Sequence, residues 1–226
     1  GELSGNGGAF TLDGVVAERI DIASGVPATC TGCVSPDANF RTDVVIEGSS
    51  FVDGLGLTLW QDAIVRDTEV ARNVDRGIRA YGQVLTLERV VIEDNTSDDY
   101  GGGLYASGSV EVIGSDVTIR RNRAGVSGGA VFVRGSIDLV DSTVTENTAV
   151  SGGAFFAATA GVRLDLADTV VTGNTAYQGG ALHAPLASGP ASAFRRRFTS
   201  DPVLMSTGQA VWHIPSTAQV STDSYS

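Results

Sequence analysis

The sequence contains no lysine, few prolines and no long apolar run, and each shortage excludes a class of protein. All 15 basic residues are arginines, against 26 acidic residues, which gives a net charge of −11. Such an acidic chain is poorly suited to binding nucleic acid through its phosphates, and a lysine base is excluded. No apolar run approaches the roughly 20 residues of a membrane-spanning helix. With 6 prolines, and apolar residues spaced regularly among 29 glycines, the composition excludes collagen and disordered linkers.

Cysteine is also scarce, with one pair in the stretch Cys30-Thr-Gly-Cys33. This spacing is compatible with a redox pair in a cytosolic enzyme, but no strand–helix–strand pattern surrounds it. A zinc site needs two further ligands near by, and His183 and His213 are far along the chain. We therefore favour a small loop disulfide in an exported protein, which predicts an extracellular or bacterial cell-surface location.

A phrase of asparagine, a short polar loop, two glycines and small or apolar residues recurs along the chain. Its copies are Asp94–Ala106, Arg120–Val133, Glu146–Ala157 and Gly173–Ala184. The asparagines of this series, with one earlier member, are Asn73, Asn95, Asn122, Asn147 and Asn174, spaced 22 to 27 residues apart. Self-similarity at a period of this length indicates a stacked repeat.

The segments between the asparagines alternate between apolar and polar residues. Examples are Leu85-Thr-Leu87, Val110-Glu-Val112 and Ile137-Asp-Leu139. Alternation with a period of two predicts strands with one buried face, and no segment of this region has a helical period. A unit of about 25 residues cannot bury its apolar face alone, whereas stacked coils pair each strand with its equivalent one coil away. We therefore predict an all-β chain, a right-handed parallel β-helix of roughly seven to eight coils.

Two local features have a physical role in such a fold. The repeated asparagines tolerate a left-handed backbone and can hydrogen-bond along a ladder of identical neighbours, so we predict a structural ladder of Asn73, Asn95, Asn122, Asn147 and Asn174. The paired glycines fit a corner where no β-carbon can be accommodated.

The phrase resembles the repeat of the polymorphic outer-membrane proteins, which pairs Phe-x-x-Asn with Gly-Gly-Ala and then Ile, Leu or Val. Gly128-Gly129-Ala130-Val131 and Gly179-Gly180-Ala181-Leu182 match it, whereas Ile or Val replaces Phe before every asparagine. The resemblance covers about residues 57–189, with one further copy at Gly7. It implies a β-helical protein of the bacterial surface, but hardly specifies an activity.

One domain, residues 1–226, accommodates the whole pattern. We expect irregular coils and the cysteine loop in 1–56, regular coils in 57–184, a surface arm in 185–202, and a last coil and tail in 203–226. The repeat phrase begins as early as Gly7, and no capping helix is evident at either end of the pattern. Since solenoids normally cap their ends, either this sequence is cut from a longer chain or another copy covers each end, and we expect the second, a head-to-tail self-association into a filament.

The strongest candidate for a site is a column of residues after the paired glycines. In each copy these residues lie between two small or apolar positions that we expect to point inward, so they are expected to point outward. The column comprises Tyr105, Phe132, Phe156 and His183, with Arg79 before it and Trp212 after it. The alternative is the inverted register, in which the same rings form a ladder inside the coil. We favour the outward register and predict a surface that contacts a partner or a glycan.

Other polar groups are interpreted as a solvated surface. The acidic and basic residues at expected outward positions, Glu111, Asp138, Arg163 and Asp165, are expected to lie scattered over different columns. Asp94, Asp98 and Asp99 lack the recurring spacing of a calcium repeat. The run Phe194–Phe198 places three arginines between two aromatics and is expected to pack on the protein's own acidic surface. We predict no catalytic residue, no metal and no cofactor.

These observations predict a non-catalytic, structural or adhesive solenoid outside the cell or on its surface, with itself or a surface glycan or protein as partner. The alternative is a polysaccharide-active lyase or hydrolase, or a carbohydrate-binding module, of the same fold. A convergent acid cluster in a groove favours the enzyme. An exposed aromatic stripe without such a cluster favours binding or assembly.

Overall fold

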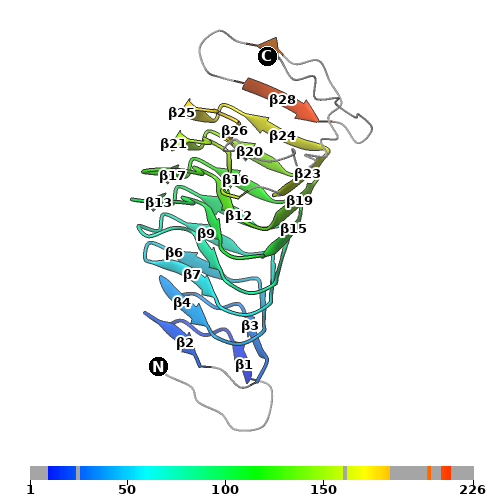
Figure 1. The fold of residues 1–226 in the computed structure, drawn as a ribbon. Helices are drawn as coiled ribbons and strands as arrows, with labels where there is room; N and C mark the ends of the chain where they lie inside the picture. Colours follow the sequence, from blue (N-terminus) through cyan, green and yellow to red (C-terminus); the bar gives the residue numbers. More distant parts are fainter. Residues whose placement is uncertain (1–9, 24–25, 160–161, 184–202, 205–209, 215–226) are drawn as a thin grey trace.

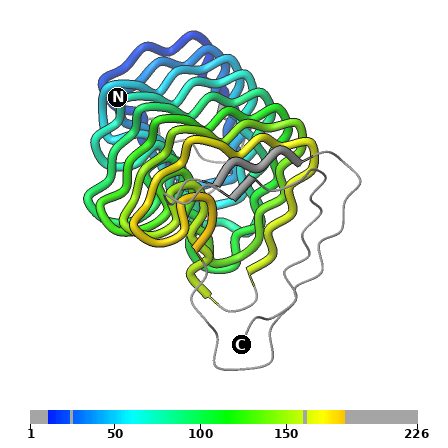
Figure 2. The backbone as a smooth tube through the Cα atoms, turned by 90° about the horizontal axis from the view of Figure 1, so that it is seen from above, coloured from blue at the N-terminus to red at the C-terminus, as the bar shows by residue number. Residues whose placement is uncertain are grey.

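The structure, a computed structural model, describes residues 10–23, 26–159, 162–183, 203–204 and 210–214. These residues form strands β1 to β28 and no helix. Equivalent strands of successive coils stack along one axis, from the N-terminal coils at one end to the coil of β24 and β25 toward the other (Figure 1). Viewed along this axis, the coils lie over one another as a continuous winding (Figure 2). The predicted all-β fold of stacked parallel strands, a β-solenoid, is confirmed.

Two of the three eight-stranded sheets consist of parallel strand pairs only. The first sheet contains, in order, β1 (Phe10–Asp13), β3 (Ala28–Thr31), β5 (Val44–Glu47), β8 (Ala63–Arg66), β11 (Val84–Glu88), β15 (Glu111–Ser115), β19 (Ser136–Val140) and β23 (Arg163–Ala167). The second sheet contains β2 (Ile20–Ile22), β4 (Asp37–Phe40), β7 (Gly56–Leu59), β10 (Ile78–Ala80), β14 (Leu104–Ala106), β18 (Val131–Val133), β22 (Phe155–Ala157) and β26 (Leu182–His183).

Two further sheets complete the coils. The third sheet contains β6 (Ser50–Val52), β9 (Glu69–Ala71), β12 (Val91–Glu93), β16 (Thr118–Arg120), β20 (Thr143–Thr145), β24 (Thr169–Thr172), β28 (Ala210–Ile214) and β27 (Val203–Leu204). The fourth sheet contains the short strands β13 (Thr96–Ser97), β17 (Arg123–Ala124), β21 (Thr148–Ser151) and β25 (Thr175–Gln178). A full coil therefore passes from the first sheet through the third and fourth to the second.

The interior of the solenoid is one continuous apolar core. Inward positions of each strand carry Leu, Ile, Val, Ala and Phe, and they line up from coil to coil because the parallel register is kept. For example, Leu104 pairs with Val131 and Val131 with Phe155, and all three are buried. Since each buried side chain packs on its equivalents above and below, burial of these columns is the main stabilising contribution.

The asparagine ladder forms as the spacing predicts. All five asparagines are buried, and the amide nitrogen of each of the first four donates to the side-chain oxygen of the next asparagine, at 2.9 to 3.0 Å. The same oxygen also accepts the backbone N–H of the preceding asparagine, as in the 2.9 Å bond from Asn122 to Asn147. The ladder thus satisfies polar groups that the turn would otherwise leave buried without partners.

The paired glycines have two separate roles at their corner. Gly128 has a φ of +71°, a left-handed conformation that glycine adopts without cost. A β-carbon on Gly129 would lie 2.4 Å from the carbonyl oxygen of Gly153 in the next coil. The first glycine therefore meets a conformational need and the second permits close approach of two coils.

Three expectations need correction or cannot be addressed. Cys30 and Cys33 form the predicted disulfide, but both are fully buried core residues and Cys30 belongs to β3, so the pair is not in a surface loop. Segment 210–214 is not another parallel coil, because β28 pairs antiparallel with β24. The Gly7 copy, the arm 185–202 with Phe194–Phe198, and the tail beyond 214 lie outside the described residues. In the described part of the chain, no helix has the length and apolar character that crossing a membrane requires.

Candidate functional site: an aromatic track on the second sheet

The predicted aromatic column lies on the outer side of the second sheet. Tyr105 pairs with Phe132, Phe132 with Phe156, and Phe156 with His183, all in parallel register. The residues on either side of Phe132, Val131 and Val133, belong to the apolar core. Because side chains alternate along a strand, the rings point away from the core, and the inverted register is excluded.

The rings of this column stack on one another. Centroid separations are 5.2 Å between Tyr105 and Phe132, 5.5 Å between Phe132 and Phe156, and 5.3 Å between Phe156 and His183. The interplanar angles are 17°, 9° and 12°, so the rings are nearly parallel. Near-parallel rings at these separations are offset-stacked and stabilise adjacent coils by about 0.5–1.5 kcal/mol per pair beyond their burial.

Two aromatic residues that sequence reasoning missed extend the stack toward the N-terminal coils. Trp60 directly follows β7 and Tyr81 directly follows β10, and their rings stack with centroids 4.6 Å apart. Tyr81 meets Tyr105 edge-on at 6.2 Å. Trp60, Tyr81, Tyr105, Phe132, Phe156 and His183 therefore form one continuous series of ring contacts, which we call the aromatic track.

Trp212 does not belong to the aromatic track. Its strand β28 pairs with β24 in the third sheet and places Trp212 opposite Val171, so its prediction as the next member of the column is wrong. The alternation of a short strand does not reveal its direction or its sheet, since antiparallel and parallel strands share a period of two. Arg79, in contrast, lies in the predicted column, paired with Tyr105 on β14.

Arginines border the aromatic track. The guanidinium of Arg76 lies 5.1 Å from the centroid of Tyr105, and that of Arg134 lies 5.8 Å from the centroid of Phe132. Tyr100 also contacts Phe132, at 4.9 Å between centroids. Phe132 is consequently only 3% exposed although it lies outside the core. It supports its neighbours, while the half-buried Tyr105 and Phe156 offer the accessible surface.

A separate group of charged residues lies on the outer side of the first sheet. Asp138 pairs with Asp165 in one column, and Arg163, from the adjacent column, lies 3.4 Å from Glu111 and 4.0 Å from Asp165. Burial, and then the negative charge of Asp165, raise the pKa of Asp138 above its ordinary value. These groups do lie in different columns, as expected, but the two columns are adjacent, so the groups are close together rather than scattered. Their neighbouring positions depend on cross-coil register, which the sequence does not state directly.

Two of the three aspartates weighed for calcium, Asp94 and Asp99, lie against arginines. Asp94 accepts two hydrogen bonds from Arg121, at 2.9 and 2.7 Å, and the guanidinium of Arg76 lies 3.9 Å from Asp99. Among the residues that the structure describes, no group of three or more His, Cys, Asp or Glu side chains is placed to hold a metal ion.

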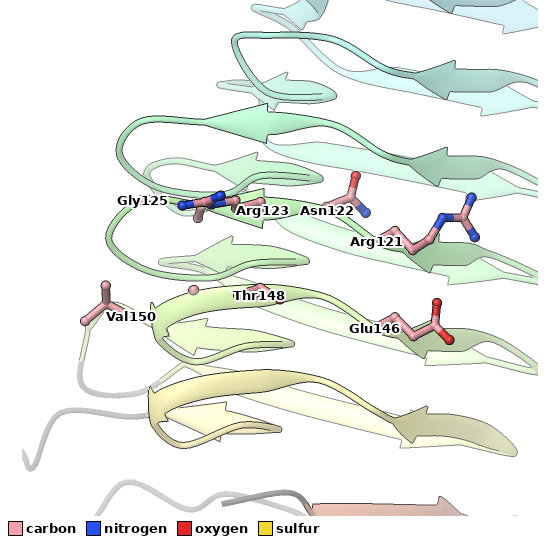
Figure 3. A pocket seen from close by; sticks show the side chains of 9 residues that line it. Arg121, Asn122, Arg123, Gly125, Glu146, Thr148 and Val150 are labelled. Carbon is pink, nitrogen blue, oxygen red and sulfur yellow. The ribbon is translucent and has the colours of Figure 1, made fainter.

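Two surface hollows lie on different parts of the solenoid. One, of about 420 Å³, runs along the turns beside β17 and β21. Figure 3 shows Arg121 and Glu146 one above the other at one end of it and Val150 at the other. Its lining combines the charged Arg121, Arg123 and Glu146 with smaller residues such as Ala124, Gly125 and Ala149. The other, of about 360 Å³, contains Trp60 and Tyr81 and therefore adjoins the aromatic track.

No protein-family model matches the chain, and neither the curated proteins nor the solved structures that were compared with it contain a match.

Proposed function

We propose that this chain is a non-catalytic solenoid of the extracellular space or the bacterial cell surface, with a structural and adhesive role. The aromatic track is its contact surface for a macromolecular partner. We also infer that the winding is right-handed, as such crossovers between parallel strands nearly always are. We also propose seven to eight coils, a number supported by the eight strands in each of the first two sheets. The likeness of the Gly-Gly-Ala phrase to the polymorphic outer-membrane-protein repeat and the disulfide support the location.

The observation that carries this proposal is the aromatic track itself. A row of aromatic rings on an outer face does not improve solubility, whereas surfaces that contact partners are enriched in aromatic residues and arginine. The coil register spaces the rings evenly and holds them rigidly, so little side-chain entropy is lost when a partner binds. The bordering Arg76 and Arg134 supply donors around this apolar centre.

The test is a binding measurement with matched variants. Purified chain is assayed against immobilised polysaccharides, matrix proteins and intact bacterial cells. Phe156→Ser and Tyr105→Ser remove accessible rings, and Thr145→Ser, on the outer side of the third sheet, is the control. We expect both aromatic variants to weaken binding by roughly tenfold or more while the control binds normally. Wild-type chain that binds nothing, or aromatic variants that are folded and bind normally, contradicts the proposal.

We include end-to-end self-association in this proposal. At one end of the solenoid, β23, β25 and β26 are the last strands of their sheets, and none of the described strands pairs with their outer edges. Open strand edges are templates for pairing with a second chain. Light scattering at increasing concentration should show growing assemblies. A strict monomer at high concentration contradicts this part and leaves the adhesive role intact.

A second candidate function is cleavage of a polysaccharide, and the group of Glu111, Asp138, Asp165 and Arg163 favours it. A carboxyl group with a raised pKa, such as that of Asp138, close to a second carboxyl group is the usual arrangement for general acid catalysis on a glycosidic bond. The release of reducing or unsaturated sugar ends from a polysaccharide panel tests it. Activity that Asp138→Asn abolishes would establish the enzyme and overturn the non-catalytic proposal.

A further inference from the structure

The hollow at the N-terminal end of the aromatic track has the composition of a small ligand site. It opens on the outer side of β4, β7 and β10 and has a volume of about 360 Å³. This lies at the lower end of the usual range for small-molecule sites, roughly 300–1,000 Å³. It is lined by an indole and a phenol, one leucine and five polar or charged side chains: Trp60, Tyr81, Leu55, Thr58, Asn39, Asp37, Arg19 and Arg79.

Trp60 differs from the other rings of the aromatic track because it is the first. One face of its indole stacks on Tyr81, and the residue in the equivalent position one coil earlier is Arg41. No described aromatic ring therefore covers its other face, and 44% of the residue is exposed. From Tyr81 to Phe156 each ring of the track lies between two others and offers mainly its edge. Trp60 thus offers an aromatic face to a ligand.

The orientation of the Trp60 indole is fixed by polar contacts with residues of the preceding coils. The indole N–H of Trp60 donates to the side-chain oxygen of Asn39 at 2.7 Å. Asn39 is itself nearly buried and donates through its amide nitrogen to Asp21 at 3.1 Å. Arg19 lies 3.3 Å from Asp21 and 3.5 Å from Asp37. The ring is consequently held by a chain of polar contacts that reaches across two coils, as a preorganised binding site requires.

The polar groups of the wall are charged but mutually paired. Arg19 lies between two carboxylates, and Arg79 pairs with Asp75 and donates weakly to Thr58 at 3.4 Å. Guanidinium groups have five donor hydrogens each and carboxylates about four acceptor sites, so both keep capacity for a ligand. Because the charges compensate one another, and the whole chain carries −11, an anionic ligand gains little here.

We propose that this groove binds one or two units of a neutral glycan. The apolar face of a pyranose ring stacks on the exposed face of Trp60, and its hydroxyls exchange hydrogen bonds with Arg19, Asp37 and Arg79. A neutral sugar satisfies both halves of the wall, since it offers C–H groups to the indole and hydroxyls that both donate and accept. The inference rests on the proposed adhesive function and names the chemistry of its ligand.

The experiment is titration of the purified chain with neutral oligosaccharides, followed by calorimetry and by tryptophan fluorescence. A printed panel of neutral, uronic-acid-containing and sulfated glycans identifies the probe. We expect binding to neutral members, and a loss of affinity of roughly tenfold or more in Trp60→Ala. Trp60→Phe keeps a ring on Tyr81 but loses the hydrogen bond to Asn39, so its affinity should lie between those of wild type and Trp60→Ala. Tyr177→Ala is the matched control, because Tyr177 is 89% exposed on β25, away from the groove.

Three results would overturn the inference: no neutral glycan binds, only anionic glycans bind, or folded Trp60→Ala and Trp60→Phe bind as wild type does. The adhesion assay separates this failure from failure of the proposed function. If Phe156→Ser loses adhesion and Trp60→Ala keeps it, the aromatic track is adhesive but the groove is not its sugar site. If neither variant changes adhesion, both ideas fail.

Discussion

Each inner asparagine of the ladder forms hydrogen bonds with several buried polar groups at once. Asn122 donates to the carbonyl of Ile92 at 2.9 Å and to Asn147 at 3.0 Å. Its oxygen accepts from both the backbone and the side chain of Asn95, at 3.0 and 2.9 Å. An amide has a donor and an acceptor in one rigid group, whereas aspartate lacks the donor. This explains why the repeat carries asparagine at the same point of successive coils.

Replacement of the Asn122 side chain should therefore lower the free energy of unfolding. In Asn122→Ala the carbonyl of Ile92 and the N–H of Asn95 lose buried partners, and each unsatisfied group costs about 1–3 kcal/mol. We expect the free energy of unfolding to fall by about 2–4 kcal/mol, measured by chemical denaturation. Arg123→Ala, at the next and exposed position, should change it by less than about 0.5 kcal/mol. Equal effects of the two variants would show that the ladder does not stabilise the fold.

The turns before and after the strands of the third sheet combine strained backbone with charge. Described residues other than glycine with positive φ are all Asp, Arg or Glu, including Arg89 at 52° and Asp94 at 55°. Ion pairs between coils accompany this strain, as between Asp53 and Arg72 at 2.8 Å. The coil register places the residues that follow the third-sheet strands in one column, where the charges alternate in sign and neighbouring side chains attract one another: Asp53, Arg72, Asp94, Arg121 and Glu146.

The pH dependence of stability should report these pairs. Hydrogen bonds from Arg121 are the largest cause of the lowered pKa of Asp94. A carboxyl group whose folded pKa is lowered stabilises the fold above its unfolded value, about 3.9, and loses this contribution as the pH falls through the folded pKa. We expect Asp94→Asn to be less stable than wild type at pH 7 and the difference to shrink below about pH 4. Denaturation at a series of pH values measures it.

Asp138 provides a comparison of opposite sign. Its pKa is raised, chiefly by burial, so the folded protein binds its proton more readily than the unfolded chain does. Asp138→Asn should thus cause no loss of stability at pH 7, and any advantage over wild type should disappear toward low pH. A loss for Asp138→Asn that matches the loss for Asp94→Asn would contradict the assignment of both groups.

The strands could be predicted from sequence far better than the surface they carry. Alternation and the asparagine period are local signals, and the register that they imply is kept by the core. The aromatic track was found only where Gly-Gly aligns the copies. Trp60 and Tyr81 belong to coils that lack the Gly-Gly phrase, and each lies just beyond a strand. Aligning Leu57-Thr-Leu59 with Ile78-Arg-Ala80 would have brought them into one column.

The molecule as a linear stack of coils should not unfold uniformly. Each coil packs only on its neighbours, so inner coils are supported on two sides and outer coils on one. We expect the backbone N–H groups of Asn95 and Asn122, which donate to buried side-chain oxygens, to exchange most slowly with solvent. Protection should decrease toward β2 at one end and β26 at the other. Mass spectrometry or NMR of exchange measures this gradient, and equal protection throughout would instead indicate one cooperative unit.

The asparagine ladder also gives the solenoid an electrical direction. The amide nitrogens of Asn73, Asn95, Asn122 and Asn147 each donate to the asparagine oxygen of the next coil, so the oxygens from Asn95 to Asn174 all accept from the preceding coil. The side-chain dipoles, each of about the 3.5 D of a peptide group, therefore add with their positive ends toward the C-terminal coils. A second copy stacked head to tail would continue this series. A copy stacked head to head would oppose like poles, so the ladder favours polar over symmetric filaments.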